Sequence, residues 1–453
     1  MKSVSVIMPC LNVGKYISKC LESVLNQTLY DIEIIVVDAG STDESLNIIK
    51  MYMEKDSRIK LICTKTRSYG FQVNLGIQEA KSEYIGIVET DDYIEHDMYE
   101  VLYSNIVNTD AEYIKCCADK YFEKNGWERR YEFIPCPELE ANNILFLKPK
   151  ETPRLFYSDN FIWNGIYRRD FISKFRLSET KGAAFQDIGM LFRMISNASK
   201  GIYIKHKGYN YRQDNVLSSS FSHNGLNYIF YEYYAIKSLL NELDEEWTYI
   251  YYRKLAAHIL GCFYIMACEN VFWEECRNSI EEMRGDIRNA VNNNILKKDS
   301  FEIAEEWECI LKFLRNEDDL FRYCKNLFYH KSETIKNSLV IFGNHDWFIF
   351  GCGIRGKKLY ELLRKFPIAI KGFCDNSENK QNKSCEGLPI LSVGDALMKY
   401  PNAHFIVPNK IGRNEIVTQL YNSSVSMENI MLAYEELFDK FRYDDIFTLR
   451  MIL

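Results

Sequence analysis

Three short, nearly continuous apolar runs lie in the first ninety residues, at 4–9 (VSVIMP), 33–38 (EIIVVD) and 84–88 (YIGIV). Runs of this length without alternation are typical of strands buried on both faces of a sheet. The segments between them, 17–25 and 46–53, place apolar residues three and four positions apart, which predicts helices that cover the sheet. Strands joined by helices run parallel. The pattern therefore predicts an α/β fold with a mainly parallel sheet.

Acidic residues follow two of these predicted strands. Asp38 ends the second run, and Glu89 and Asp91 follow the third. Because the carboxyl ends of parallel strands meet at one edge of a sheet, where ligands of open α/β sheets usually bind, we expect these three carboxylates to converge. Such a cluster is suited to a divalent cation and an anionic ligand.

The whole chain divides into three parts. Residues 1–220 hold the strand-helix alternation and its extension, and residues 221–335 carry dense helical patterning with few Gly or Pro. Residues 336–453 begin a second α/β pattern, so we expect three parts in the 453-residue chain. The longest apolar stretch, 255–268, is too short to span a bilayer and is interpreted as a core helix.

The second α/β pattern contains a glycine motif. A predicted strand at 347–350 precedes Gly351-x-Gly353-x-x-Gly356, and Asp375 ends the next predicted strand nineteen positions after Gly356. This is the context of a dinucleotide-binding fingerprint. It predicts a Rossmann-like domain with a second nucleotide site. The domain could instead be an interaction module, and helix-to-sheet packing alone would also use Gly356.

Composition narrows the class of protein. The net charge of -7 argues against a nucleic-acid partner, since phosphate backbones require clustered Lys and Arg. The 14 cysteines contain no C-x-x-C pair and no zinc-ligand spacing, so we expect free thiols in a reducing compartment. The first predicted strand begins within three residues of the N-terminus, which leaves no room for a signal peptide, and we expect a cytoplasmic location.

Several motifs occur in one order over the first half of the chain. They are VSVIMPCLN, EIIVVDAGSTDES, YGFQVNLGIQEAKSEYIGIVETDDYI, WNGIYRRDF, FQDIGMLFR and YRQDNVLSSS. Together they resemble the family 2 glycosyltransferases of the GT-A fold. The resemblance implies transfer of a sugar from a nucleotide-diphosphate donor to an acceptor hydroxyl, with inversion at the anomeric carbon.

The resemblance also implies roles for particular residues. Glu89, Thr90 and Asp91 align with the D-x-D motif, so Glu89 and Asp91 are expected to hold Mg²⁺ or Mn²⁺, and Asp187 resembles the general base. The expected donor contacts are Pro9, Asp38, Asn74, Glu89, Thr90, Asp91 and Arg212. The expected acceptor contacts are Trp163 and Asn164.

Simpler interpretations stand beside these roles. Asp187 precedes an apolar-periodic run and could be a helix N-cap, Arg212 could form a structural ion pair, and Trp163 could be a packing residue. Gln72 replaces a basic residue common in the family, and Glu89 stands where the first Asp of the motif is usual.

The favoured hypothesis is a metal-dependent, inverting glycosyltransferase acting on a glycan or lipid-linked acceptor in bacterial cell-surface polysaccharide or lipopolysaccharide synthesis. Peripheral association with the inner face of the plasma membrane and a homo-oligomer are compatible with it. One alternative is a nucleotide-dependent oxidoreductase or epimerase that acts on sugar nucleotides through the C-terminal domain. Another is a non-catalytic scaffold that binds sugar nucleotides.

Overall fold

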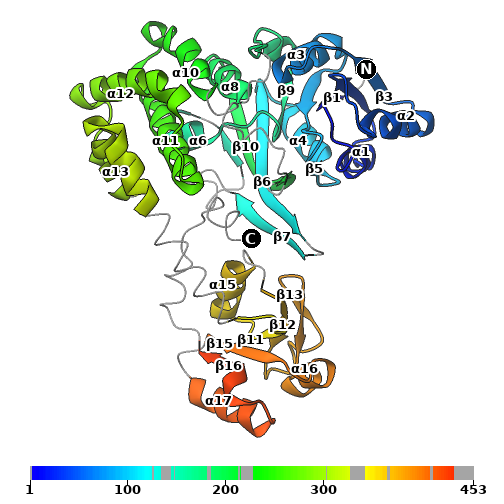
Figure 1. Ribbon diagram of the computed structural model, residues 1–453. Helices are drawn as coiled ribbons and strands as arrows, with labels where there is room; N and C mark the ends of the chain where they lie inside the picture. The colour runs from blue at the N-terminus through cyan, green and yellow to red at the C-terminus, as the bar shows by residue number, and fades with distance from the viewer. Residues whose placement is uncertain are drawn as a thin grey trace. The chain divides into compact units, whose positions relative to one another are not determined.

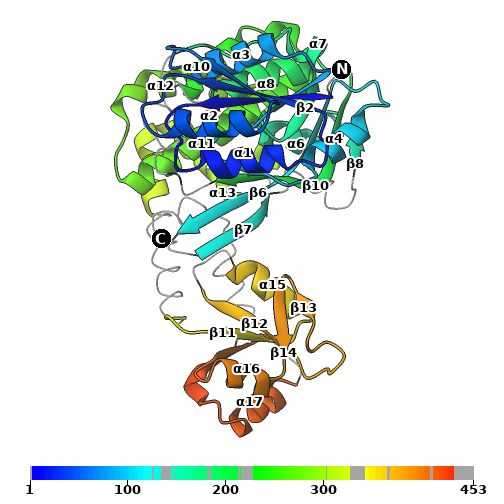
Figure 2. The same cartoon turned by 90° about the vertical axis from the view of Figure 1, so that its right-hand side faces the viewer.

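The computed structural model describes residues 3–124, 127–133, 144–146, 148–180, 185–212, 215, 228–301, 304–326, 342–364, 368–408 and 412–432. The chain forms two compact units. The first comprises 1–122, 132–266 and 271–322, and the second 123–131, 267–270 and 323–453. Figures 1 and 2 show the elements of both units in two views.

A ten-stranded sheet forms the centre of the N-terminal part. Its strands are β1 (Val4–Cys10), β2 (Ile32–Asp38), β3 (Ile59–Cys63), β4 (Tyr84–Ile87), β5 (Tyr93–Ile94), β6 (Tyr113–Lys124), β7 (Trp127–Phe133), β8 (Ile144–Phe146), β9 (Gly165–Arg168) and β10 (Gly201–Arg212). The order is β3-β2-β1-β4-β9-β6-β10-β5, with β7 beside β6 and β8 beside β10. β1 pairs in parallel with both β2 and β4, which confirms the mainly parallel arrangement expected of the three apolar runs.

The described part of the first unit also contains helices, some of which pack on the two faces of the sheet. They are α1 (Ile17–Leu25), α2 (Ser45–Lys55), α3 (Tyr69–Glu79), α4 (Met98–Ile106), α6 (Pro153–Ser158), α7 (Arg169–Ile172), α8 (Gln186–Ser196), α10 (Ile229–Lys237), α11 (Glu245–Glu269), α12 (Arg277–Asn292) and α13 (Ala304–Arg315). Alternate residues of β1, such as Val4, Val6 and Met8, share a core with α1, α2 and α4. The opposite face packs on α3, where Gly76 lies against Ile7. Every residue of β1 and β2 is buried, which is why the runs lack polar alternation.

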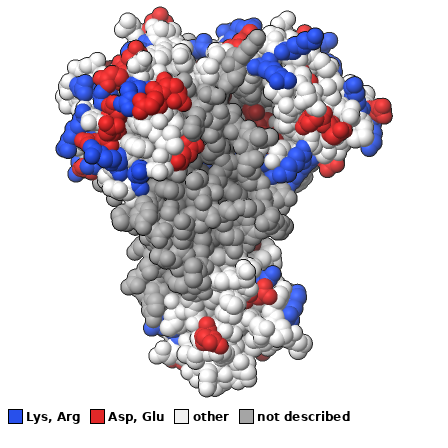
Figure 3. All heavy atoms as spheres, in the orientation of Figure 1, with Lys and Arg blue, Asp and Glu red and all other residues white. Residues whose placement is uncertain are grey.

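The helical patterning expected at 221–335 corresponds to α10, α11, α12 and α13, and the first unit extends to Arg322. Residues 221–227 and 327–335, and most of the YRQDNVLSSS motif, lie outside the described residues. The division at 220 and 335 stays a prediction. Among the helices that the structure describes, none is both long enough and apolar enough to cross a bilayer. On the face in Figure 3, basic and acidic side chains are interspersed over the helical part of the first unit.

The second unit has its own sheet of six strands. They are β11 (Trp347–Phe350), β12 (Ile370–Cys374), β13 (Ser384–Cys385), β14 (Leu388–Leu391), β15 (His404–Val407) and β16 (Ile430–Leu432). The order is β13-β14-β12-β11-β15-β16, and all pairs except β13 with β14 are parallel. Without β13, the strands follow the third-second-first-fourth-fifth order of doubly wound α/β folds.

Helices cover both faces of the second sheet as well. α15 (Ile354–Leu363) packs on one face, and α16 (Val393–Lys399) and α17 (Arg413–Asn422) pack on the other. α15 begins at Ile354, inside the glycine motif, so Gly356 lies in its first turn.

The glycines of this turn differ in the space around them. A Cβ on Gly356 would overlap the carbonyl oxygen of Gly351, whereas a Cβ on Gly353 would have no heavy atom within 4 Å. Gly351 adopts φ +89°, the left-handed region that favours glycine. Gly356 is thus required for the helix to approach the turn.

We expect Gly356→Ala to lower the free energy of unfolding of the second unit by about 1–3 kcal/mol, because the added methyl group meets backbone that cannot rotate away. Differential scanning calorimetry of the full chain measures the change. Gly353→Ala is the matched control and should leave the transition in place. Equal effects of the two substitutions would contradict the packing argument.

Candidate active site

Residues 89–92, directly after β4, form an acidic loop, and hydrogen bonds hold this loop between strands β1 and β10. The Thr90 hydroxyl donates to the carbonyl oxygen of Pro9 in β1 at 2.7 Å. The Tyr209 hydroxyl of β10 accepts from the Glu89 amide at 3.1 Å and donates to Asp92 Oδ2 at 2.8 Å. One tyrosine therefore holds both ends of the loop.

Trp163 supports this tyrosine. Its ring stacks on that of Tyr209, with centroids 4.1 Å apart, and its side chain is only 4% exposed. The Asn164 amide is also buried and donates to Cys116 O and to the Tyr203 hydroxyl. Both residues pack in the interior, as the simpler interpretation of Trp163 expected, and their contact with an acceptor stays a prediction.

Arg212 closes the loop from its other side. Its amide donates to Asp92 Oδ1 at 2.7 Å, and its Nε donates to the carbonyl oxygen of Asp91 at 2.8 Å. The guanidinium lies 4.7 and 4.8 Å from the ring centroids of Tyr16 and Tyr121. This positively charged group is thus held beside the acidic loop by cation–π contacts.

The charges of three carboxylates interact at this edge. Glu89 accepts a 2.5 Å hydrogen bond from the Tyr69 hydroxyl, and Asp91 accepts one of 2.8 Å from the Asn215 amide. Burial raises the pKa of Glu89 to about 8, and the negative charges of Asp91 and Asp187 add to this increase. The Gly70 amide, next to Tyr69, donates to Gln186 Oε1 at 2.8 Å and so links this edge to the residue before Asp187.

Asp187 lies in the first turn of α8. The helix cap is Phe185, in the left-handed conformation with φ +63° and without a side-chain hydrogen bond, so Asp187 does not occupy the N-cap position. Burial raises the pKa of Asp187 to about 7. The charge of Glu232 raises this pKa further, and the charges of Lys115 and Lys254 lower it. A carboxyl group in this range is suited to accept a proton near neutral pH.

Asp38 shapes the turn that follows β2. Its carboxylate accepts from the Gly40 amide at 2.9 Å and from the amide and hydroxyl of Ser41. The side chain is 1% exposed. Asp38 lies at the expected edge, where β2 pairs with β1, but its oxygens are occupied by the turn. Its contact with a nucleotide base stays a prediction.

Two side chains of α3 brace the same edge. The Gln72 amide donates to the carbonyl oxygens of Cys10 and Val37, which end the adjacent strands β1 and β2. Asn74 exchanges hydrogen bonds with the backbone of Leu177, so both ends of its amide are engaged. The donor contact expected of Asn74 stays a prediction, and the structure shows it holding a neighbouring segment.

The residues expected to hold a metal are compatible with one. Among the described residues, no group of three or more His, Cys, Asp and Glu side chains is arranged to hold an ion. Mg²⁺ is usually bound through one or two carboxylates together with substrate phosphates, so such a group is not required. Glu89 and Asp91 repel each other at a partly buried edge, and a cation between them would remove that repulsion.

In the second unit, Asp375 lies where the fingerprint places it. Its Oδ2 accepts from the Cys352 amide at 3.1 Å, within the glycine turn, and from Lys380 Nζ at 3.1 Å. These hydrogen bonds hold the pKa of Asp375 at about 2, against the opposing effect of burial. Gly351, Gly353, Gly356 and Asp375 are thus brought together, and nucleotide binding there stays a prediction.

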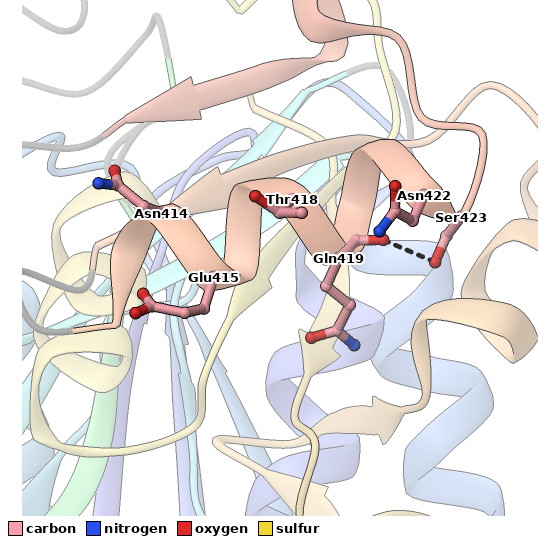
Figure 4. Close-up of a pocket in the computed structure, with 6 residues that line it drawn as sticks. All are labelled: Asn414, Glu415, Thr418, Gln419, Asn422 and Ser423. Carbon is pink, nitrogen blue, oxygen red and sulfur yellow. Dashed lines mark hydrogen bonds between the residues drawn. The ribbon is translucent and has the colours of Figure 1, made fainter.

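The second unit also has a shallow hollow of about 600 Å³ along α17. The lining residues are Asn414, Glu415, Thr418, Gln419, Asn422 and Ser423, and they follow one face of a single helix (Figure 4). Gln419 is already engaged in a reciprocal amide pair with Asn376. None of the predicted site residues lines this hollow.

The fold is that of the GT-A glycosyltransferases. Staphylococcus aureus TarS, residues 1–349 in complex with UDP-GlcNAc, has a similar fold, with a TM-score of 0.58 at 18% identity over 73% of this chain and 92% of that chain. The model of glycosyl transferase family 2 matches residues 5–176.

Two relatives match a longer part of the chain than the family model does. The uncharacterized glycosyltransferase YibD of Escherichia coli is 30% identical over 250 residues, which is 54% of this chain and 72% of that protein. Glycosyltransferase GlyG of Streptococcus pneumoniae is 32% identical over 218 residues, which is 46% of this chain and 70% of that protein. The chain belongs to glycosyltransferase family 2.

The sequence motifs did not identify several side chains that contact the acidic loop. The Tyr69 hydroxyl contacts Glu89, and the Tyr209 hydroxyl contacts Asp92. The Asn215 amide contacts Asp91. Tyrosines are frequent in this chain, at 31, so residue type alone did not distinguish these two. Lys115 and Lys254 were also missed, because each lies in an apolar context that predicts core packing.

Tyr209→Phe should lower the free energy of unfolding of the first unit by about 1–3 kcal/mol, because it leaves the Glu89 amide and Asp92 Oδ2 without a partner in the interior. Chemical denaturation measures the loss. Tyr103→Phe, at a partly buried tyrosine that packs edge-on against Tyr84, is the matched control. If both variants unfold at the same denaturant concentration, Tyr209 does not hold the loop as described.

Proposed function

We propose that the protein transfers a sugar from a nucleotide-diphosphate donor to an acceptor hydroxyl, with Asp187 as the general base. The observation that supports this proposal is a pair of hydrogen bonds from the start of α3: the Tyr69 hydroxyl donates to Glu89 of the acidic loop, and the Gly70 amide donates to Gln186 Oε1, one residue before Asp187. A proton acceptor thus lies next to the acidic edge at which the donor diphosphate would be held.

Glu89 and Asp91 would hold Mg²⁺ or Mn²⁺ on the donor diphosphate. Bound there, the cation would supply charge stabilisation as a Lewis acid to the leaving diphosphate. Arg212, fixed on the Asp91 carbonyl, adds a positive charge at the same place. Thr90 and Tyr209 keep the loop backbone in one conformation, so the carboxylates need little reorganisation before the donor binds.

The donor is proposed to lie along the edge formed by Pro9, the Asp38 turn and the acidic loop. The likeness to TarS, whose solved structure contains UDP-GlcNAc, supports a nucleotide-diphosphate sugar as the ligand. Asn74 and Gln72 contribute by holding the surrounding backbone.

Inversion follows if one displacement completes the transfer. Asp187 would take the proton of the acceptor hydroxyl as the hydroxyl attacks the anomeric carbon from the face opposite the diphosphate. Proton transfer of this kind contributes about 10²–10⁴ in rate. The local charges keep the pKa of Asp187 near the pH at which such a base works well.

The acceptor is proposed to be a glycan or lipid-linked sugar in bacterial surface polysaccharide synthesis. Chondroitin synthase of Escherichia coli is 37% identical over 98 residues, and the cholesterol galactosyltransferase of Borreliella burgdorferi is 30% identical over 226 residues. These relatives support glycan or lipid acceptors as classes. The cytoplasmic location, peripheral membrane association and homo-oligomer expected from the sequence stay predictions.

Asp91→Asn should reduce the stabilisation that a nucleoside diphosphate gives in the presence of Mn²⁺. At a fixed ligand concentration, stabilisation depends on occupancy, so weaker binding appears as a smaller shift of the unfolding temperature. A thermal-shift screen with UDP, GDP and dTDP, with and without Mn²⁺, measures this. Asp170→Asn, at an exposed ion pair with Arg168, is the control and should respond like the wild type. An undiminished Mn²⁺-dependent shift in Asp91→Asn would exclude Asp91 as a metal ligand.

Asp187→Asn should reduce hydrolysis or transfer from the donor by about 10²–10⁴ while leaving donor binding intact. In the wild type the rate should fall about tenfold per pH unit below pH 7, because protonation of a carboxyl with a pKa of about 7 removes the base. Initial rates of nucleotide release between pH 5 and 9 test both statements. Full activity of Asp187→Asn would remove Asp187 from the mechanism.

A further inference from the structure

Two cations meet on one tyrosine ring beside the acidic loop. The Lys19 ammonium, from the first turn of α1, lies 4.4 Å from the ring centroid of Tyr121 in β6. The Arg212 guanidinium lies 4.8 Å from the same centroid. The Tyr121 side chain is fully buried, whereas Lys19 is exposed at the surface. A ring fixed in the interior therefore holds one cation that reaches solvent and a second that is itself buried.

Further contacts fix the position of Lys19. Its Nζ donates a 2.9 Å hydrogen bond to the Tyr121 hydroxyl, so this tyrosine holds the lysine through both its ring and its oxygen. The ammonium also lies 4.2 Å from the ring centroid of Tyr93, which packs edge-on against Tyr121 with centroids 5.1 Å apart. Contacts of this kind position an ammonium group without neutralising its charge. Lys19 is thus held in place and keeps its attraction for an anion.

Hydrogen bonds join this cluster to the acidic loop at two points. Arg212 Nε donates to the carbonyl oxygen of Asp91 at 2.8 Å. On the side of Lys19, the thiol of the next residue, Cys20, donates to the carbonyl oxygen of Glu89 at 3.4 Å. The two cations are therefore tied to the same loop whose carboxylates are the proposed metal ligands.

A ligand suited to two such cations is an anion with more than one charged group. The diphosphate of the proposed donor is a group of this kind, and the carboxylates of the loop would repel it. Lysine binds phosphate as a point charge and arginine through its planar fork. Positive charge beside the loop would offset the repulsion between the carboxylates and the diphosphate.

We propose that Lys19 and Arg212, joined through the Tyr121 side chain, form one phosphate-binding unit for the donor. In this unit Lys19 is a second cationic contact to the diphosphate, and Tyr121 is a positioning residue that acts through the two cations. The inference rests on the proposed function and deepens it. It gives a role to a lysine that lies outside the sequence motifs of the family.

Lys19→Gln should weaken the binding of a nucleoside diphosphate about tenfold, the loss expected when a hydrogen bond to a charged group is removed. The probe is whichever of UDP, GDP and dTDP stabilises the wild type most with Mn²⁺, and isothermal titration calorimetry measures its dissociation constant. The loss should shrink in about 1 M NaCl, where charges are screened beyond about 3 Å, because Lys19 is exposed. Lys19→Arg should restore most of the affinity, because it restores the charge.

Lys55→Gln is the matched control. Lys55 is also an exposed lysine beside a tyrosine, with its ammonium 5.8 Å from the ring centroid of Tyr52. It is the last residue of α2, which leads to the amino end of β3, and so it lies at the edge of the sheet opposite the acidic loop. The control should bind the diphosphate like the wild type. Equal losses from Lys19→Gln and Lys55→Gln would reduce the effect to net charge and overturn the proposal.

A double-mutant cycle tests the positioning role of Tyr121. Tyr121→Phe keeps the ring and removes the hydroxyl that accepts from Lys19, so it should weaken binding about threefold in the wild type. In the Lys19→Gln background the same change should have no effect, because its partner is already absent. Equal losses in the two backgrounds would show that Tyr121 acts by packing alone. Lys19→Gln alters an exposed side chain, so it tests the phosphate contact even if Tyr121→Phe unfolds.

The outcomes separate this inference from the proposed function. If none of the three diphosphates binds the wild type, both fail. If the wild type shows a Mn²⁺-dependent affinity that Asp91→Asn loses, and Lys19→Gln still binds like the wild type, only this inference fails.

Discussion

Repulsion among carboxylates at the end of β4 is the constraint on which the rest of the site depends. Glu89, Asp91 and Asp92 follow one strand within four residues, and Asp187 approaches from α8. Burial raises the pKa values of Glu89, Asp92 and Asp187, and repulsion adds to the shift, from other carboxylates of the loop for Glu89 and Asp92 and from Glu232 for Asp187. A chain that concentrates negative charge in this way needs compensation, and the surrounding structure supplies it in two forms.

The first form is neutral hydrogen bonding, from the hydroxyls of Tyr69 and Tyr209. The second is the positive charge of Arg212, held between two aromatic rings beside the Asp91 carbonyl. The proposed cation would bring further positive charge to this edge.

The sequence predicted the strands of the N-terminal sheet and the edge of that sheet at which the acidic residues lie, because buried parallel strands leave a strong apolar pattern. β1, β2 and β4 lie where the runs indicated, and Asp38, Glu89 and Asp91 lie at their carboxyl ends. The contacts were not predictable, since Tyr209 reaches Glu89 from 120 positions away and no local pattern marks such a partner. Trp163 and Asn164 are buried, and their contact with an acceptor stays a prediction.

The link between Tyr209 and Glu89 has a consequence for biosynthesis. A ribosome that has released the first hundred residues has produced β1, β2 and β4, yet Tyr209, Arg212 and α8 are still missing. Long-range contacts of this kind form late. A nascent polypeptide should therefore have no ordered acidic loop until translation has passed β10, because an incomplete chain lacks the contacts of Tyr209 and Arg212 with that loop.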